Sequence, residues 1–192
     1  MQPPEKTDAS TKTFIYPVEF LKLTSCEDVP LAGRELYAVA CHLYLRPGEL
    51  RALVWTDVDF DAGVVHVTRG YDEDSQATKP PKTRNGVRDI PISIALLPLL
   101  KVMRDRAADD GAPALPLMAE RCGDLRSVWM RRHFARADVT RSRLTEHTAP
   151  TMKINFRSWR DPGITWLAPA GVDVAKISGA PGTTRSPRRS AT

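Results

Sequence analysis

The chain has 192 residues, of which 42% are hydrophobic and 27% charged, and these values suit one soluble globular domain that buries a core of its own. No apolar run approaches the ~20 residues of a membrane-spanning helix, and the N-terminal stretch MQPPEKTDAS lacks the features of a signal peptide, so we expect a cytoplasmic protein without membrane contact. The three cysteines, Cys26, Cys41 and Cys122, are too scattered for a metal-ligand pattern and are predicted to be reduced thiols that pack.

The net charge of +5 is compatible with nucleic-acid binding but does not identify it. Residues 178–192 contain Arg185, Arg188 and Arg189 and no acid, so this tail accounts for +3 and the remainder of the chain for +2. Basicity alone therefore does not indicate a DNA-binding protein.

The N-terminal part is predicted to be a leader followed by helices. Residues 1–13 are polar, contain two prolines and are expected to be disordered. A short helix is predicted over residues 16–24, with Pro17 near its start. A dense apolar pattern over residues 35–45 predicts a nearly buried helix, which Pro47-Gly48 ends. A further helix is predicted from Gly48 to Trp55.

Arg46 stands between these two predicted helices, directly before Pro47-Gly48. A guanidinium is a planar fork that matches phosphate oxygens bidentately, so its placement favours phosphate binding. The structural alternative is a helix-turn-helix hairpin in which Arg46 pairs with Glu49 or with another carboxylate. These eight residues, LYLRPGEL, leave both interpretations open.

The hydrophobic period changes after Trp55. Residues 57–63 are rich in turn formers, residues 64–68 have the β-branched character of a strand, and residues 87–92 predict a second strand. Between them lies the polar stretch YDEDSQATKPPKTRNG, whose Asn-Gly pair at residues 85–86 signals a turn. Four cations gather near this turn and are expected to project from a β-hairpin tip, either as a solvated loop or along a phosphate backbone: Lys79, Lys82, Arg84 and Arg88.

The C-terminal half is predicted to be helical. Residues 94–107 form an amphipathic helix with Pro98 in its first turns, and residues 110–114 join it to a basic helix over residues 125–137. Four side chains of the basic helix suit a DNA-facing surface, although such a run is also typical of a solvated face: Arg131, Arg132, His133 and Arg136. His133, beside Phe134, is predicted to be structural.

Arg157 and Arg160 lie three residues apart and would share one helix face, with Trp159 anchoring that helix in the core. Like charges at this spacing repel by a few tenths of a kcal/mol in isolation, and a shared anionic ligand would reverse the sign. An apolar helix is predicted from residue 163, and a second helix follows Gly171 up to residue 177.

Three stretches, LRPGELRALVWTDVDFDAG, KPPKTRNGVRDIPI and FRSWRDPGITWLAPAGVDVAKI, resemble in order and spacing the catalytic domain of the phage-type integrases, the tyrosine recombinases. The resemblance covers roughly residues 14–177 and implies a mixed α/β fold, mostly α-helical with a small antiparallel β-sheet. It also implies DNA integration and recombination without a cofactor. A tyrosine attacks the scissile phosphate of double-stranded DNA, cationic donors stabilise the transition state, and other protomers take part.

Carried over by position, the resemblance makes Arg46 the first catalytic arginine and Glu49 a supporting acid. Lys82 would be the hairpin lysine that protonates the leaving oxygen, and Arg160 the second arginine. Arg157 occupies the position usually held by His or Lys. It can donate hydrogen bonds there, but its very high pKa prevents it from shuttling a proton. Further DNA contacts are expected from Lys79, Arg84, Arg88, Arg131 and Arg132.

The resemblance fails after Ile177. The family continues with a Gly-His pair and then the nucleophilic tyrosine, whereas the tyrosines here all come earlier in the sequence: Tyr16, Tyr37, Tyr44 and Tyr71. Suitable codons with one nucleotide inserted after that of Ile177 restore Gly-His and tyrosine at the family spacing. We therefore expect residues 14–177 to be a truncated, catalytically inactive integrase domain and residues 178–192 to be a disordered, frameshifted tail.

Other functions stay open at this point. The chain could be a non-catalytic DNA-binding module that occupies the site of an intact integrase, or an inert pseudogene remnant. The cluster of Arg46, Arg157 and Arg160 could also bind a different phosphate or have a purely structural role.

Overall fold

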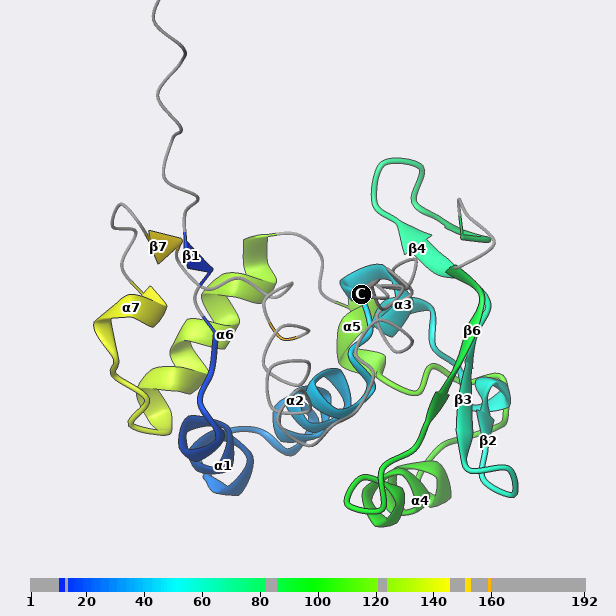
Figure 1. Cartoon of the computed structure of the whole chain (residues 1–192), viewed down its shortest axis with the longest axis horizontal. Coiled ribbons are helices and arrows are strands. Elements are labelled where there is room, and N and C mark those ends of the chain that lie inside the picture. Colours follow the sequence, from blue (N-terminus) through cyan, green and yellow to red (C-terminus); the bar gives the residue numbers. More distant parts are fainter. Residues whose placement is uncertain are drawn as a thin grey trace, which may run out of the picture.

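The computed structural model describes residues 11–12, 14–81, 86–120, 124–145, 151–152 and 159, and helices are its main elements (Figure 1). The helices are α1 (Pro17–Ser25), α2 (Leu31–Leu43), α3 (Pro47–Ala52), the 3₁₀ helix η1 (Trp55–Asp57), α4 (Leu97–Asp105), α5 (Pro116–Glu120), α6 (Asp124–Arg136) and α7 (Ser142–Thr145). The strands are β1 (Thr11–Lys12), β2 (Val58–Asp59), β3 (Val64–Val67), β4 (Gly70–Asp72), β5 (Ala77–Lys79), β6 (Arg88–Pro91) and β7 (Thr151–Met152). The predicted mixed, mostly helical architecture with a small antiparallel sheet is confirmed.

The ends of the chain lie largely outside the described residues, so the predicted leader, the apolar stretch 163–177 and the tail 178–192 stay predictions. Two residues of the expected leader, Thr11 and Lys12, are described, and they pair in parallel with Thr151 and Met152. Within the described ranges, no helix has the length and apolar character to cross a membrane.

Helix α1 confirms the prediction for residues 16–24 and begins at Pro17, whose fixed φ suits the first helical position. Glu19 accepts a hydrogen bond from the Tyr16 backbone N–H at 2.8 Å, and Arg141 donates to its two carboxylate oxygens at 2.7 and 2.8 Å. Arg141 also donates to the Phe14 carbonyl at 2.6 Å. This arginine therefore ties α1 and the residues before it to the chain that follows α6.

Helices α2 and α3 differ in extent from the prediction, although the break between them is where Pro47-Gly48 indicates. Helix α2 begins four residues earlier, at Leu31, and ends at Leu43, because Tyr44 adopts a left-handed backbone with φ of 51°. Helix α3 ends at Ala52 instead of continuing to Trp55. The cause is tertiary: the Leu53 carbonyl accepts a hydrogen bond from Ala114 N–H at 2.9 Å, which keeps this segment extended.

The three-stranded sheet has the order β2-β3-β6, and all its strands are antiparallel. The predicted pairing of the strands near residues 64–68 and 87–92 is confirmed, with Val65 opposite Ile90, and both side chains are buried. The polar stretch between these strands contains the β4–β5 hairpin, which the sequence analysis missed. All of β5 is exposed, so the stretch lacks the alternation of apolar and polar residues that marks a half-buried strand.

A cluster of aromatic rings holds α2 against α6. The Trp159 ring stacks on that of Tyr37 with centroids 4.5 Å apart, and its indole N–H points to Met130 Sδ at 3.0 Å. His133 of α6 faces α2, with its Nδ1 3.0 Å from the Tyr37 hydroxyl, and is 1% exposed. The predictions that Trp159 is a core anchor and that His133 is structural are both confirmed. Arg157 and Arg160, on either side of Trp159, lie outside the described residues.

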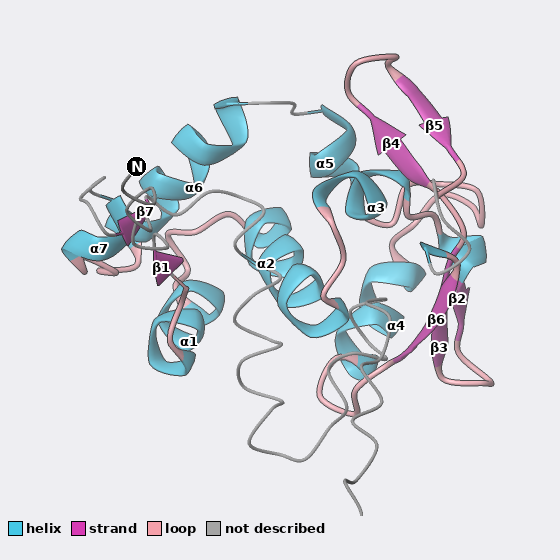
Figure 2. Cartoon of the chain, turned by 45° about the horizontal axis from the view of Figure 1, so that its top comes forward, coloured by secondary structure: helices cyan, strands magenta, loops and turns pink. Residues whose placement is uncertain are grey.

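Helix α3 packs directly on the β4–β5 hairpin, which Figure 2 shows beside it. The two backbones approach closely because Gly48 has no side chain: a Cβ there would lie 2.5 Å from the Tyr71 carbonyl oxygen. The close packing of the helix start on the hairpin therefore requires a glycine at position 48.

Burial of His133 makes the stability of the fold depend on pH. Burial, and secondarily the charge of Arg136, lowers the pKa of His133 from 6.5 to about 4, so between these values the unfolded chain binds a proton that the folded chain does not. The free energy of unfolding should fall as the pH drops from 6.5 towards 4, and His133→Gln should reduce this slope in urea titrations between pH 5 and 6.5. In the control His66→Gln the slope should persist. The hydrogen bond to Asp89 raises the pKa of exposed His66, so His66 changes the free energy of unfolding only at pH values above 6.5. Equal slopes in wild type and His133→Gln would contradict the assignment.

Replacing Gly48 should separate α3 from the hairpin. Gly48→Ala places a methyl group against the Tyr71 carbonyl, and we expect a loss of about 1–3 kcal/mol of unfolding free energy in denaturant titrations. Gly111→Ala is the matched control, because its Cβ would meet an Asp109 side-chain oxygen at 3.4 Å. Equal stability of the two variants would show that α3 and β4 separate at little cost.

Candidate functional site

Arg46 lies at the junction of α2 and α3, where the sequence analysis placed it. Its backbone is extended, with φ of −68° and ψ of 155°, as expected for a residue that precedes proline. Glu49, in the first turn of α3, accepts a hydrogen bond from the Arg46 N–H at 2.8 Å. The sequence Arg-Pro-Gly-Glu thus forms a local helix start that brings the acid back to the arginine.

The Arg46 guanidinium is held by Glu49 yet stays accessible. Its Nη1 donates to Glu49 Oε1 at 2.8 Å, and 45% of the side chain is exposed. Within the described residues this is the one hydrogen bond that the guanidinium makes, so its other N–H donors can bind a further acceptor. The two interpretations left open by the sequence, pairing with Glu49 and binding of phosphate, are therefore compatible.

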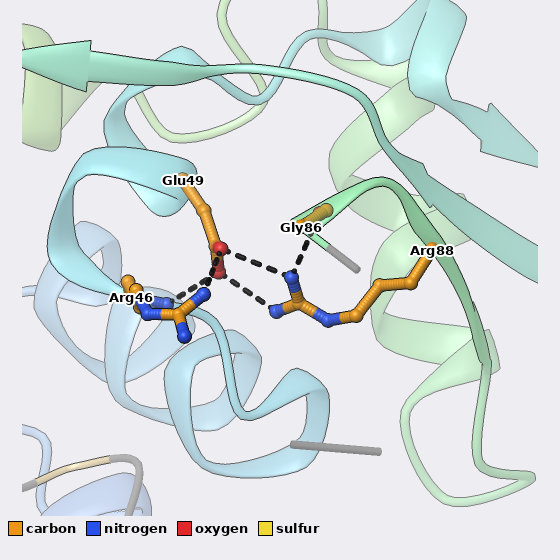
Figure 3. A network of polar contacts seen from close by, with 4 residues as sticks. All are labelled: Arg46, Glu49, Gly86 and Arg88. Carbon is orange, nitrogen blue, oxygen red and sulfur yellow. Dashed lines mark hydrogen bonds and ion pairs between the residues drawn. The ribbon is translucent and has the colours of Figure 1, made fainter. Parts of the chain in front are cut away.

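Arg88 reaches the same carboxylate from β6 (Figure 3). Its Nη1 donates to Glu49 Oε1 at 3.0 Å and its Nη2 to Glu49 Oε2 at 2.8 Å, and Nη1 also donates to the Gly86 carbonyl at 3.2 Å. Its side chain is 7% exposed. The expectation that Arg88 projects from a hairpin tip towards DNA is corrected: Glu49, 39 positions away in the sequence, holds its guanidinium inside.

The two arginines keep Glu49 ionised. Burial by itself raises the pKa of this carboxyl, but the hydrogen bonds and charge of Arg88, together with the hydrogen bonds from Arg46, outweigh burial and lower the pKa from 4.5. The side chain of Glu49 is 11% exposed. A carboxylate so enclosed has few other partners and acts as a fixed anion between two cations.

A pocket of about 320 Å³ lies beside this cluster, between the start of α3 and the β4–β5 hairpin. Ten residues line it: Arg46, Gly48, Glu49, Arg69, Gly70, Tyr71, Asp72, Lys79, Pro80 and Pro81. Two of its cations are paired with acids, Lys79 with Asp72 at 2.6 Å and Arg69 with Asp57 at 2.7 Å. The pocket can thus receive an anion at Arg46.

Sequence reasoning missed Arg69 and Tyr71 as residues of this pocket. Arg69 lies in the short connection between β3 and β4, which is a detectable signal, since connecting residues often line a site. Tyr71 gave no such signal, because its place depends on the unpredicted hairpin. Its ring lies under the Arg51 guanidinium at 3.6 Å, and its hydroxyl donates to Gln76 Oε1 at 3.0 Å.

The remaining predicted site residues are not brought to the pocket by described parts of the chain. Lys82, Arg84, Arg157 and Arg160 lie outside the described residues. Arg131 and Arg132 are on α6, half-buried and exposed respectively, and Figures 1 and 2 both place α6 across α2 from α3. Neither residue lines the Arg46 pocket.

Comparison with known proteins finds partial sequence matches, and no protein-family model matches the chain. The chain is 33% identical over 88 residues to a XerC-like tyrosine recombinase of Caldanaerobacter subterraneus subsp. tengcongensis, covering 40% of this chain and 22% of that protein. It is 36% identical over 74 residues to the prophage integrase IntR of Escherichia coli K12, covering 38% of this chain and 17% of that protein. These matches span about a fifth of the relatives' own length.

Solved structures share the fold over nearly the whole chain. The Tn1549 transposon integrase in complex with a circular intermediate DNA has a TM-score of 0.67 at 18% identity, covering 90% of this chain and 59% of that one. The XerA recombinase has a TM-score of 0.63 at 14% identity, with coverages of 94% and 58%. A lambda integrase tetramer bound to a Holliday junction has a TM-score of 0.60 at 16% identity, with coverages of 98% and 52%. The shared fold and the sequence matches identify the chain as a relative of the tyrosine recombinases, with the fold of their catalytic domain.

Proposed function

We propose that the chain is a DNA-binding domain of a phage-type integrase, a protein of site-specific DNA recombination and integration. One observation carries the proposal: Arg46 is fixed through Glu49 at a pocket while 45% of its side chain stays exposed. A fixed guanidinium whose other donors have no partner among the described residues is suited to bind a phosphate oxygen of duplex DNA. The DNA complexes of the transposon and lambda integrases, the second of them a tetramer, support DNA and further protomers as partners.

The family resemblance assigns the chemistry around the phosphate. Arg46 would stabilise its charge, together with Arg157 and Arg160, and Lys82 would protonate the leaving oxygen. Lys79, Arg84, Arg131 and Arg132 would contact the DNA backbone elsewhere, and Lys79 would exchange Asp72 for a phosphate. All of this requires the side chains alone and no cofactor.

We further propose that the 192 residues bind DNA without cutting it. The tyrosines of the sequence lie at positions 16, 37, 44 and 71, whereas the family's nucleophile follows the last helix. Tyr37 and Tyr44 are buried, at 0% and 8% exposed. Tyr71 lines the pocket, but Gln76 and Arg51 hold its hydroxyl and its ring. A chain without a placed nucleophile can bind and shield a site, and would act as a DNA-binding module.

DNA binding should depend on salt and on Arg46. We expect labelled duplex DNA to bind in fluorescence anisotropy titrations, with an affinity that falls as the KCl concentration rises. Arg46→Ala should weaken binding about tenfold and reduce the salt slope by about 1, because one phosphate contact is lost. Lys82→Ala in the same chain should weaken binding further.

Arg106→Ala is the matched control for that measurement. Arg106 is 46% exposed and pairs with Glu35, much as Arg46 is 45% exposed and pairs with Glu49, but it does not line the pocket. Its removal should leave the affinity within about twofold, since an exposed pair contributes little. If Arg46→Ala and Arg106→Ala weakened binding equally, the phosphate site would be elsewhere.

The same chain should form no covalent link to DNA. We would incubate it with a pool of nicked duplexes of random sequence, which traps a phosphotyrosyl bond without knowledge of the target, and look for an SDS-resistant adduct. The control is a synthetic gene with suitable codons and one nucleotide inserted after that of Ile177, whose product would carry Gly-His and a tyrosine and should form the adduct. An adduct with the 192-residue chain, lost in Tyr71→Phe, would overturn the proposal and make Tyr71 the nucleophile.

A further inference from the structure

We propose that Arg88 is a positioning residue of the Arg46 site: it neutralises the Glu49 carboxylate, so that Arg46 keeps its positive charge for a phosphate. This inference rests on the proposed function of the same pocket. It concerns a residue that the sequence analysis expected on the DNA-facing tip of a hairpin, and it assigns Arg88 a role without DNA contact.

The contacts show how Arg88 acts through Glu49. Its two terminal nitrogens each bind one carboxylate oxygen, at 3.0 and 2.8 Å, in the bidentate geometry that fixes the plane of a carboxylate. Arg46 binds the same two oxygens through its backbone N–H and its Nη1, both at 2.8 Å. The orientation of the Arg46 guanidinium therefore depends on a carboxylate that Arg88 holds in place (Figure 3).

Burial excludes a direct contact between Arg88 and a large ligand. The side chain is 7% exposed, against 45% for Arg46, so a DNA backbone at the pocket reaches one arginine and not the other. Arg88 Nε is buried and has no hydrogen-bond partner in the described structure, so the terminal nitrogens carry its interactions. A lysine would keep the charge, but as a point charge it would not reproduce the two-point grip.

The net charge of Arg46, Arg88 and Glu49 determines how strongly the site attracts a phosphate. Two guanidinium groups and one carboxylate sum to +1, whereas Arg46 and Glu49 alone would be a neutral pair with little attraction for a phosphate. The hydrogen bonds of the two arginines and the charge of Arg88 outweigh burial and lower the pKa of Glu49, so it is ionised and the +1 persists across the neutral range.

The test measures duplex DNA affinity by fluorescence anisotropy at a series of KCl concentrations, in the full chain. Arg88→Met should weaken binding about tenfold, comparably to Arg46→Ala, although its side chain touches no DNA. The double variant Glu49→Gln/Arg88→Met restores the net charge of +1 but removes the carboxylate that orients Arg46, so it should bind several-fold more tightly than Arg88→Met and less tightly than wild type. Arg88→Lys, which keeps the charge, should fall between wild type and Arg88→Met.

The outcomes separate charge balance from a structural brace. If Arg88 only braces the fold, the double variant stays as weak as Arg88→Met, and the proposal is overturned. Wild-type affinity in a folded Arg88→Met would overturn it as well. Should Arg88→Met fail to fold, the salt slope of Glu49→Gln decides: loss of the carboxylate charge should leave the slope at least as steep as in wild type, and a shallower slope of the folded variant contradicts charge balance.

The same titrations distinguish a failure of the inference from a failure of the proposed function. If wild type shows no salt-dependent binding, or if Arg46→Ala binds as wild type does, the phosphate role of the pocket is wrong and the role of Arg88 falls with it. If Arg46→Ala weakens binding while the Arg88 variants bind as wild type, the pocket binds DNA and the inference alone is overturned.

Discussion

The site depends on one carboxylate that binds two guanidinium groups. Glu49 takes four hydrogen bonds, three of them from guanidinium nitrogens, and joins the start of α3 to β6 across 39 residues of sequence. Removing one partner of such a buried pair typically costs about 3–5 kcal/mol, because the other charge is left in a poorly solvated place. A complete cluster contributes far less net stability, so its main effect is to fix positions.

That fixing explains how an exposed arginine can have a defined direction. A free arginine side chain loses up to about 2 kcal/mol of rotamer entropy when a ligand orders it. Here the hydrogen bond to Glu49 has already ordered Arg46, and the packing of α3 on β4 through Gly48 fixes the pocket wall opposite. The entropy of the Arg46 side chain is therefore lost during folding and not on binding, so the affinity for a phosphate is higher.

Much of the fold could be predicted because its signals are local. Pro17 and Pro47 mark helix starts, Pro47-Gly48 marks the break after α2, and the β-branched run at residues 64–68 marks β3. The errors arise where distant contacts decide. Helix α3 stops before Trp55 because Leu53 pairs with Ala114, 61 positions further on, and the exposed β5 strand has no apolar pattern to detect.

The site divides in the same way. Arg46 and Glu49 are three residues apart, and the helix start that joins them follows from Pro47 and from the first turn of α3, so their pairing could be anticipated from the sequence. Arg88 could not be assigned in that manner. A cation on a strand beside a turn can face either the solvent or an acidic partner. The partner of Arg88 is Glu49 in α3, which the local sequence around Arg88 does not indicate.

The order of residues in Arg-Pro-Gly-Glu therefore carries more information than the arginine itself. Pro47 favours the extended backbone of Arg46 directly before α3, and Gly48 admits the Tyr71 carbonyl at a distance that no side chain would allow. Glu49, in the first turn of α3, then accepts hydrogen bonds from the guanidinium groups of Arg46 and Arg88. Each position meets a different physical requirement, so an arginine followed by other residues would lack the extended turn, the close wall or the counter-ion that together direct it at the pocket.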